Sequence, residues 1–204
     1  MIRKPLPFLL SVILAFAASR ATAQPLRDGD IIFHTSRSAQ SLAIQKATHS
    51  KYSHMGIVFL RGGEPYVYEA IGTVQYTPLK KWIARGEGGH YVVKRLRDAD
   101  RILTPDGVAR LRHAAARFAG RPYDLTFEWS DQRIYCSELV WKVYDRALGV
   151  RVGRLQKLRE FDLSDPRVKA KMKERYGHGI PLTENVISPG EMFAFDGLVV
   201  VDEK

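Results

Sequence analysis

The sequence predicts an α+β fold, in which a small, mostly antiparallel sheet packs against helices. Two observations predict it. Short runs with strand character fall mainly in the first half of the chain, and segments with helical spacing fall mainly in the second half. Strands and helices that are segregated in this way are typical of α+β folds rather than of alternating α/β folds. We found no internal repeat and no linker rich enough to divide the chain into domains.

The strand predictions rest on alternation and on turn residues. Asp28-Gly29-Asp30 predicts a turn before a short buried strand, and Gly62-Gly63 predicts the turn of an antiparallel hairpin. The predicted strands are residues 31–33, 53–60, 66–71, 73–76, 91–96 and 192–201.

The helix predictions rest on capping signals and on the spacing of apolar residues. Thr104-Pro105-Asp106 combines a cap, a proline at the first helical position and an acid in the first turn. The predicted helices are residues 36–46, 105–119, 136–148 and 166–176, the last of them exposing Lys169, Lys171, Lys173 and Arg175.

The first 23 residues have the order of features of a signal peptide. Arg3 and Lys4 form a basic start, residues 7–18 form an apolar core of about a dozen residues, and Ala21-Thr22-Ala23 supplies small residues at a cleavage site. We therefore expect cleavage before Gln24 and a single mature domain over residues 24–204 that is exported to the periplasm or secreted. No later stretch approaches the roughly 20 apolar residues that cross a bilayer, so we expect no transmembrane segment in the mature protein.

The charge of the chain favours anionic partners. The formal net charge is +10, and removal of the predicted signal peptide takes away three basic residues and no acid, which leaves about +7. A basic exported protein is attracted to an anionic envelope surface, such as cell-wall polymer or lipid headgroups. Because no basic and aromatic recognition motif accompanies the charge, we expect no nucleic-acid partner.

The chain contains one cysteine, Cys136. An unpaired thiol is a liability in an oxidising compartment, so it is either buried and inert or kept for its chemistry. Its predicted place is the first residue of a helix, where the helix dipole and free backbone N–H groups favour a thiolate. The same N–H groups can stabilise an oxyanion formed after attack on a carbonyl.

A thiolate nucleophile needs a base and a group that orients the base. His54 lies at the start of a predicted strand, on the same face as Gly56, which would let another chain or a substrate approach closely. Glu69 lies on the apolar face of the next predicted strand, where a buried carboxylate needs a partner. An imidazole from His54 and an ordinary salt bridge to an arginine are two alternatives for that partner.

The sequence contains no motif that is typical of a metal site or a nucleotide site. His49 and His54 are five residues apart, which does not place two ligands on one face of a helix or strand, and there is no cysteine pair. No glycine-rich phosphate loop or G-x-S-x-G elbow occurs. We expect no metal and no cofactor.

Several short segments, taken in their order along the chain, resemble a known family. They are Leu26 to Phe33 (LRDGDIIF), Ala43 to Thr48 (AIQKAT), Ser53 to Val58 (SHMGIV), Gly120 to Asp124 (GRPYD), Tyr135 to Val140 (YCSELV), Tyr176-Gly177 and Ile187 to Gly190 (ISPG). These resemble the NlpC-type papain-like cysteine peptidases, in which the cysteine segment ordinarily precedes the histidine strand. Because the order is reversed here, the chain more closely resembles the circularly permuted YiiX/YebB-like branch.

This resemblance implies a circularly permuted papain-like fold and a catalytic triad of Cys136, His54 and Glu69. Many NlpC relatives use a second histidine as the orienting group, and Glu69 departs from that pattern. The resemblance also implies that Tyr123 lies beside the active site. We expect it to bind substrate together with Ser53 and Tyr135, which directly precede the histidine and the cysteine.

The implied activity is hydrolysis of an amide bond through a thioester acyl-enzyme, with peptidoglycan stem peptides as the expected substrate. Two alternatives remain at this stage. One is a lipid ester or N-acyl amide hydrolase or acyltransferase with the same triad. The other is a non-catalytic cell-envelope binding protein on the same fold. We expect residues 150–190 to border the cleft and to choose among substrates.

Overall fold

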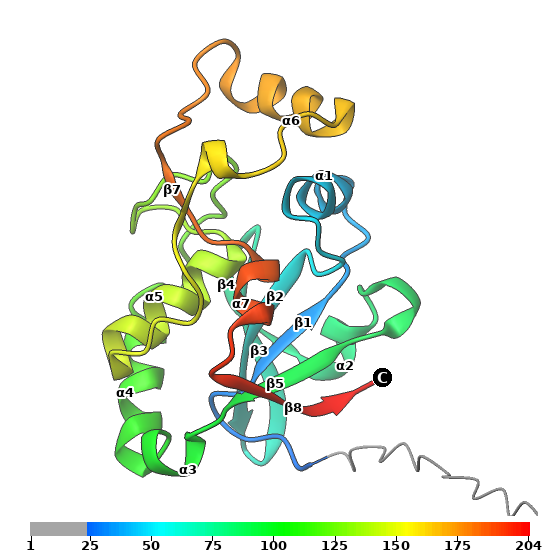
Figure 1. Cartoon of the computed structure of the whole chain (residues 1–204). Helices are drawn as coiled ribbons and strands as arrows, with labels where there is room; N and C mark the ends of the chain where they lie inside the picture. The colour runs from blue at the N-terminus through cyan, green and yellow to red at the C-terminus, as the bar shows by residue number, and fades with distance from the viewer. Residues whose placement is uncertain (1–23) are drawn as a thin grey trace, which may run out of the picture.

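The computed structural model describes residues 24–204, and the predicted signal peptide lies outside the described residues. Six antiparallel strands form one sheet in the order β4-β3-β2-β1-β5-β8, which Figure 1 shows near the centre of the molecule. Their bounds are β1 Ile31–His34, β2 His54–Arg61, β3 Glu64–Ile71, β4 Thr73–Pro78, β5 Val92–Leu96 and β8 Leu198–Glu203. The α+β expectation is confirmed.

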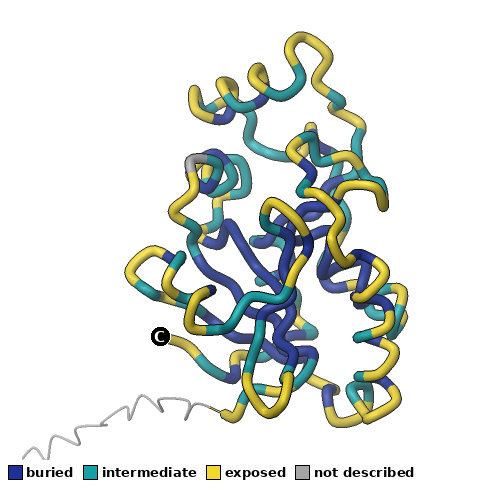
Figure 2. The backbone as a smooth tube through the Cα atoms, turned by 180° about the vertical axis from the view of Figure 1, so that it is seen from behind, coloured by how far each residue is buried: buried dark blue, intermediate teal, exposed yellow. Residues whose placement is uncertain are grey.

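The two faces of the sheet are covered by different helices. α5 (Cys136–Leu148) packs against β2 and β3, and α4 (Pro105–Ala116) packs on α5. The short α2 (Leu79–Ile83) covers the opposite face through the buried Trp82. Figure 2 shows that the strands are buried and that most of the surrounding loops are exposed. Two further short elements are the 3-10 helix η1 (Glu87–Gly89) and α3 (Ala99–Ile102), whose Ala99 belongs to the apolar cluster on the α5 side.

The predicted hairpin of β2 and β3 is confirmed, and its register positions Glu69. Val58 pairs with Val67 and Ile57 pairs with Tyr68. The side chains of Val58 and Val67 lie in the apolar cluster around Trp82, on the α2 side of the sheet. Because side chains alternate along a strand, His54 and Glu69 lie on this same side.

Gly56 allows an unusually close contact within this hairpin. A Cβ atom at Gly56 would lie 2.5 Å from Val67 Cγ1 and 2.7 Å from the Tyr68 carbonyl oxygen. The expectation that Gly56 makes room for another chain or a substrate is therefore wrong, because the space is taken by β3 itself. The glycine instead lets β3 bring Glu69 close to the strand that carries His54.

A second layer of short elements lies above the sheet, at the top of Figure 1. α1 (Ala39–Thr48) packs against α6 (Pro166–Tyr176). The chain reaches α6 through β6 (Gln156–Lys157) and the 3-10 helix η2 (Leu158–Glu160), and it returns through β7 (Asn185–Val186), which pairs with β6. This layer comes mainly from residues 150–190, the segment that was expected to border the cleft.

The predicted last strand is partly wrong. Residues 192–194 belong to a short helix, α7 (Pro189–Ala194), and only the later residues form β8. Ser188 caps this helix, since its hydroxyl accepts a hydrogen bond from the backbone N–H of Glu191, and Pro189 occupies the first helical position. These are the same start signals that predicted α4, and here they override the apolar run that resembles a strand.

A buried ion pair fixes the start of the sheet. Asp30 has no exposed surface, and its two carboxylate oxygens accept hydrogen bonds from Arg95 Nε and Nη2 at 2.7 and 2.8 Å. The same guanidinium donates to the carbonyl oxygen of Pro25 at 2.8 Å. Because the fork geometry of arginine matches a carboxylate, this contact joins β5 to the segment that enters β1.

We predict that Gly56→Ala destabilises the protein by about 1–3 kcal/mol, because the new methyl group forces β2 and β3 apart. Urea denaturation measures the change. Gly179→Ala is the matched control, since the nearest atom to its Cβ is the Tyr176 carbonyl oxygen at 3.9 Å and its φ is not positive. Equal stability of the two variants would contradict the close approach of the strands.

Candidate active site

Cys136 is the first residue of α5, and its neighbours fix the start of that helix. The Tyr135 hydroxyl accepts a hydrogen bond from the backbone N–H of Ile187 at 3.1 Å, and the Ser137 hydroxyl donates to the Ile187 carbonyl oxygen at 2.8 Å. Cys136 itself is only 2% exposed. The sulfur is therefore held at the positive end of a 13-residue helix, in a place that solvent hardly reaches.

His54 lies between a carboxylate and the cysteine. Its Nε2 is 2.6 Å from Glu69 Oε2, which leaves Nδ1 for the interaction with the thiol of Cys136. Burial alone would lower the pKa of His54, but hydrogen bonds and charge interactions with Cys136 and Glu69 outweigh it and raise the pKa to about 9. At neutral pH the ring is therefore an imidazolium, flanked by two groups that stabilise its charge.

Glu69 has no exposed surface and three hydrogen-bonding partners. Besides His54, the Thr77 hydroxyl donates to Oε1 at 2.6 Å, and Arg85 Nη2 donates to the same oxygen. Burial raises the pKa of Glu69, but the hydrogen bonds from these three side chains lower it to about 2. The two alternatives for the partner of this carboxylate, a histidine and an arginine, are both present.

A second histidine lies beside the first. His34 stacks on Trp82 with ring centroids 3.9 Å apart, and its ring is 5.3 Å from that of His54. Burial, together with the positive charges of His54 and Arg85, lowers the pKa of His34 to about 3. His34 is therefore neutral at physiological pH and forms, with Trp82, an aromatic wall against His54.

Tyr123 also reaches the cysteine. Its backbone N–H donates to the Gly72 carbonyl oxygen at 2.7 Å, which ties its loop to the end of β3. Its hydroxyl accepts a hydrogen bond from Gln40 Nε2 at 3.3 Å. Burial and the adjacent Cys136 raise the pKa of Tyr123 well above its ordinary value. The phenol therefore keeps its proton, and it can donate it toward the sulfur or toward an oxygen that forms there.

The hydroxyl of Ser53 is engaged within the protein. It lies 2.5 Å from the Ser41 hydroxyl and accepts a hydrogen bond from the backbone N–H of Ser36 at 2.9 Å. Ser53 therefore links the start of β2 to α1 and to the segment before it. Among the three residues that we expected to bind substrate, Tyr123 lines two cavities, Tyr135 lines one of them and Ser53 lines the other.

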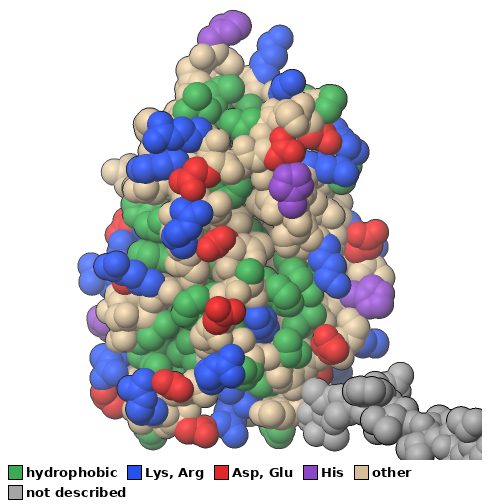
Figure 3. All heavy atoms as spheres, viewed as in Figure 1, with side chains coloured by type: hydrophobic (Ala, Val, Ile, Leu, Met, Phe, Trp, Pro, Cys, Tyr) green, Lys and Arg blue, Asp and Glu red, His purple; other side chains and the backbone are tan. Residues whose placement is uncertain are grey.

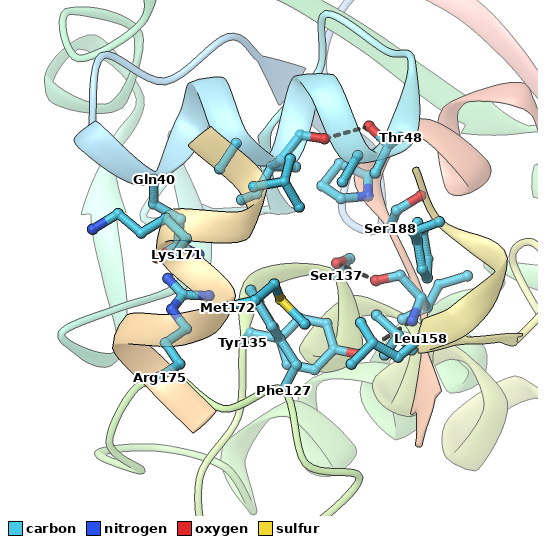
Figure 4. Close-up of a pocket in the computed structure, with 18 of the residues that line it drawn as sticks. Gln40, Thr48, Phe127, Tyr135, Ser137, Leu158, Lys171, Met172, Arg175 and Ser188 are labelled. Carbon is cyan, nitrogen blue, oxygen red and sulfur yellow. Dashed lines mark hydrogen bonds between the residues drawn. The ribbon is translucent and has the colours of Figure 1, made fainter. Parts of the chain in front are cut away.

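Two cavities lie beside Cys136 and His54, and Gln40, Ile44 and Tyr123 line both of them. One of about 80 Å³ lies between α1, α6 and the start of α5 and includes Cys136 (Figure 4). The other, of about 380 Å³, includes His54 and His34 and opens toward the end of β3. The expectation that residues 150–190 border the cleft is confirmed, because eleven of the residues that line the first cavity come from this segment.

The last predicted helix is less exposed than expected. Lys169 and Lys173 are exposed, but Lys171 and Arg175 are half-buried and line the first cavity. In Figure 4 both side chains project from α6 along one side of this cavity.

Sequence reasoning missed four residues of the site: Gln40, Thr77, Arg85 and His34. Thr77 lies on β4 and pairs with Val67, which is two residues from Glu69 on β3. A prediction of the β3–β4 register from the sequence could therefore have placed Thr77 near Glu69. Arg85 follows α2, and Gln40 belongs to α1. No local pattern marks either residue, because both reach the site only through the packing of their helices.

Two known proteins are similar to this chain over most of its length. The uncharacterized protein YiiX of Escherichia coli strain K12 is 53% identical over 193 residues, which cover 95% of this chain and 94% of that protein. A solved structure described as the metalloprotein yiiX from Escherichia coli O157:H7 has a TM-score of 0.84 and 56% identity, and it covers 87% of this chain and 97% of that chain.

Within residues 24–204, no three or more His, Cys, Asp or Glu side chains are grouped so that they could hold a metal ion. The same part of the chain contains no helix that is both long enough and apolar enough to span a membrane.

The chain also matches the sequence model of a protein family. The family described as permuted papain-like amidase enzymes, YaeF/YiiX, C92 family, matches residues 25–198, which include every residue of the site above. With the antiparallel sheet, the helix-borne cysteine and the strand-borne histidine already described, this match assigns the fold. The chain belongs to the YaeF/YiiX family of permuted papain-like amidases.

Proposed function

We propose that the protein is an exported cysteine hydrolase that cleaves amide bonds through a thioester acyl-enzyme, with a triad of Cys136, His54 and Glu69. One observation supports the proposal above the others. His54 lies between Cys136 and a fully buried Glu69, and both neighbours raise the pKa of the imidazole. A thiolate–imidazolium pair with an oriented imidazole is the arrangement that nucleophilic catalysis by cysteine requires.

In the first half of the reaction, the Cys136 sulfur attacks the carbonyl carbon of the amide and a C–S bond forms. The carbonyl oxygen becomes an oxyanion, which the backbone N–H of Cys136 and the Tyr123 hydroxyl stabilise. When the oxyanion collapses, the C–N bond breaks and the nitrogen takes the proton of His54 Nδ1. The amine leaves, and a thioester and a neutral imidazole remain.

In the second half, His54 Nδ1 accepts a proton from water while the water oxygen attacks the thioester carbon. Collapse of this second oxyanion breaks the C–S bond, releases a carboxylic acid and restores the thiolate–imidazolium pair. Glu69 holds Nε2 throughout, so that Nδ1 is the nitrogen that exchanges protons. Thr77 and Arg85 hold the carboxylate in turn.

Peptidoglycan stem peptides are the first candidate substrate, supported by the expected signal peptide and by the net positive charge. On the face seen in Figure 3, however, Lys and Arg side chains alternate with Asp and Glu and form no single basic patch. On this face the charge therefore supports a general attraction to an anionic envelope and no single docking surface. Lipid esters and N-acyl amides are the second candidate, because the cavity beside Cys136 is lined mostly by apolar side chains.

We predict that Cys136→Ala reduces amide hydrolysis by a factor on the order of 10⁴ or more, since it removes the nucleophile. Release of amines from purified sacculi and from N-acyl amides, detected with fluorescamine, measures the activity, and thermal melting checks the fold. Hydrolysis at the wild-type rate in this variant contradicts the proposal. Absence of turnover in the wild type with both substrate classes favours the non-catalytic binding protein.

We predict that the activity of the wild type falls as the pH rises through about 9, where His54 loses the proton that the leaving amine needs. Glu69→Gln removes the carboxylate that raises the pKa of His54, so this alkaline limb moves to lower pH by about one unit or more. The pH profile of kcat/KM, measured for the wild type and for Glu69→Gln, gives the position of the alkaline limb in each protein.

Glu64→Gln is the matched control for Glu69→Gln, because Glu64 is an exposed carboxylate at the start of the same strand. Its profile coincides with that of the wild type. An alkaline limb that stays in place in Glu69→Gln would show that Glu69 does not act on His54.

A further inference from the structure

The larger of the two cavities lies on the side of His54, where the amine half of a substrate has to lie. His54 lines this cavity, and in the proposed reaction it gives its proton to the leaving nitrogen, so that nitrogen lies within reach of the ring. The cavity volume of about 380 Å³ falls within the range of roughly 300–1,000 Å³ that small-ligand pockets have. We call it the amine cavity.

The lining of the amine cavity is largely polar, and its charged groups are cationic. The charged side chains among the lining residues are those of His54 and Arg85, and no Asp or Glu from residues 24–204 lines it. The nearby Glu69 carboxylate is fully buried and is already bound to His54, Thr77 and Arg85. Hydroxyl and amide groups complete the polar lining: Ser36, Ser38, Gln40 and Ser53.

His34 reports the sign of the potential in the amine cavity. Its ring lines the cavity and is only 1% exposed. Burial lowers the pKa of His34 most, and the positive charges of His54 and Arg85 lower it further. Each of these two charges has a larger effect than the Glu69 carboxylate, which acts in the opposite direction. The potential at this ring is therefore positive, which favours an anion in the cavity.

Arg85 retains donors that the protein does not use. Its Nη2 donates to Glu69 Oε1 and is, within residues 24–204, the one nitrogen of this guanidinium that donates to a protein acceptor. Nε is buried and has no hydrogen-bonding partner in the same part of the chain. The side chain is 34% exposed. Because a guanidinium has five N–H donors in a fork that matches a carboxylate or a phosphate, the remaining donors of Arg85 can bind an anion.

The start of α1 lies at the same cavity. Ser38 is the N-cap residue of α1, but its hydroxyl makes no capping hydrogen bond. Two residues earlier, Ser36 pairs in an isolated β-bridge with Gly86, which follows Arg85 in the chain. This bridge holds the segment before α1 beside Arg85. The Ser38 hydroxyl and the backbone N–H groups at the helix start therefore add donors on the side of the guanidinium.

We propose that the amine cavity binds an anionic group of the amine half through Arg85, so that the enzyme prefers amides of amines that carry a carboxylate or a phosphate; this inference rests on the proposed function. Amino acids that are acylated on their amino group are such amides. An anion in the cavity forms charge-assisted hydrogen bonds with the guanidinium, and a neutral group of the same shape does not. Arg85 then holds Glu69 with one nitrogen and selects the substrate with the others.

The test compares substrates that differ in this charge. N-acetylalanyl and hexanoyl groups are each linked to glycine, β-alanine and 4-aminobutanoate, to the carboxamides of these amines, and to O-phosphoethanolamine and ethanolamine. Fluorescamine detects the released amine and gives kcat/KM, and calorimetry measures binding to Cys136→Ala. At the spacing that reaches Arg85, the anionic substrate exceeds its neutral partner about tenfold or more in both measurements. Comparison of the carboxylates with the phosphate identifies which anion the cavity selects.

Arg85→Gln removes the preference, so that the ratio of kcat/KM between the anionic and the neutral substrate falls to about one. Because Arg85 also holds Glu69, this variant lowers the rate with both substrates, whereas a purely structural role of Arg85 would leave the ratio unchanged. Arg37→Gln is the matched control. Arg37 is exposed, lies between Ser36 and Ser38 in the chain and does not line the cavity, so the ratio of this variant equals that of the wild type.

Ser38→Asp tests the same cavity without removing a contact of Glu69. Asp is as good an N-cap residue as Ser, so α1 keeps its start. The added carboxylate repels an anionic substrate, and the ratio falls about threefold or more. Ser38→Asn is the matched control, because it places a neutral N-cap residue of similar shape at the same position and keeps the ratio of the wild type.

The outcomes separate this inference from the proposed function. Hydrolysis that depends on Cys136 but proceeds equally with anionic and neutral substrates overturns the inference and leaves the proposed function standing, and so does a preference that persists in Arg85→Gln. Preferential binding of anionic substrates to Cys136→Ala, without hydrolysis by the wild type, keeps the anion site and overturns the proposed function. Absence of both the preference and the hydrolysis overturns both.

Discussion

The site depends on the buried carboxylate of Glu69. A carboxylate without exposed surface destabilises the fold unless hydrogen bonds compensate for the lost water. Here three side chains donate to it, from β2, β4 and the turn after α2. This requirement fixes the position and the protonation of His54, and through His54 the environment of the cysteine. The same contact therefore stabilises the sheet and prepares the base.

The cysteine and the histidine come from different layers, so the packing between the layers sets their distance. α5 lies against β2 and β3, and the buried Tyr144 hydroxyl near its middle donates to the Gly29 carbonyl oxygen just before β1. At its start, Tyr135 and Ser137 bind the backbone of Ile187. Because α5 is held to the sheet and to the upper layer, the sulfur has little freedom to move away from the imidazole.

The local parts of this arrangement could be predicted from the sequence. Alternation and the Gly62-Gly63 turn indicated the β2–β3 hairpin, and capping signals indicated α4 and α6. The resemblance to a known family, rather than the spacing of the residues, brought Cys136 and His54 together as a pair. The apolar neighbours of Glu69 on β3 indicated that its carboxylate would be buried and would need a hydrogen-bonding partner.

The remaining parts depend on tertiary packing. Arg85 follows α2 and Gln40 lies on α1. No local sequence pattern predicts how these two helices pack against the sheet. The sequence indicates a close approach at Gly56 by another chain or a substrate, but it does not show that β3 itself uses the space. Ser188-Pro189 carried a helix signal that was overlooked in favour of the apolar residues after it. A basic helix is usually solvated, which predicts exposed Lys171 and Arg175, but contact with α1 turns this side of α6 inward.

Together these features bring a thiol, an imidazole and a buried carboxylate into one connected site. The most direct measurement of the central claim is the rate at which iodoacetamide alkylates Cys136 at pH 7 in the wild type and in His54→Ala, followed by mass spectrometry. If His54 stabilises the thiolate, the wild type reacts about tenfold faster or more than the variant. Equal rates in the two proteins would contradict the account, because the thiol would then not depend on the imidazole.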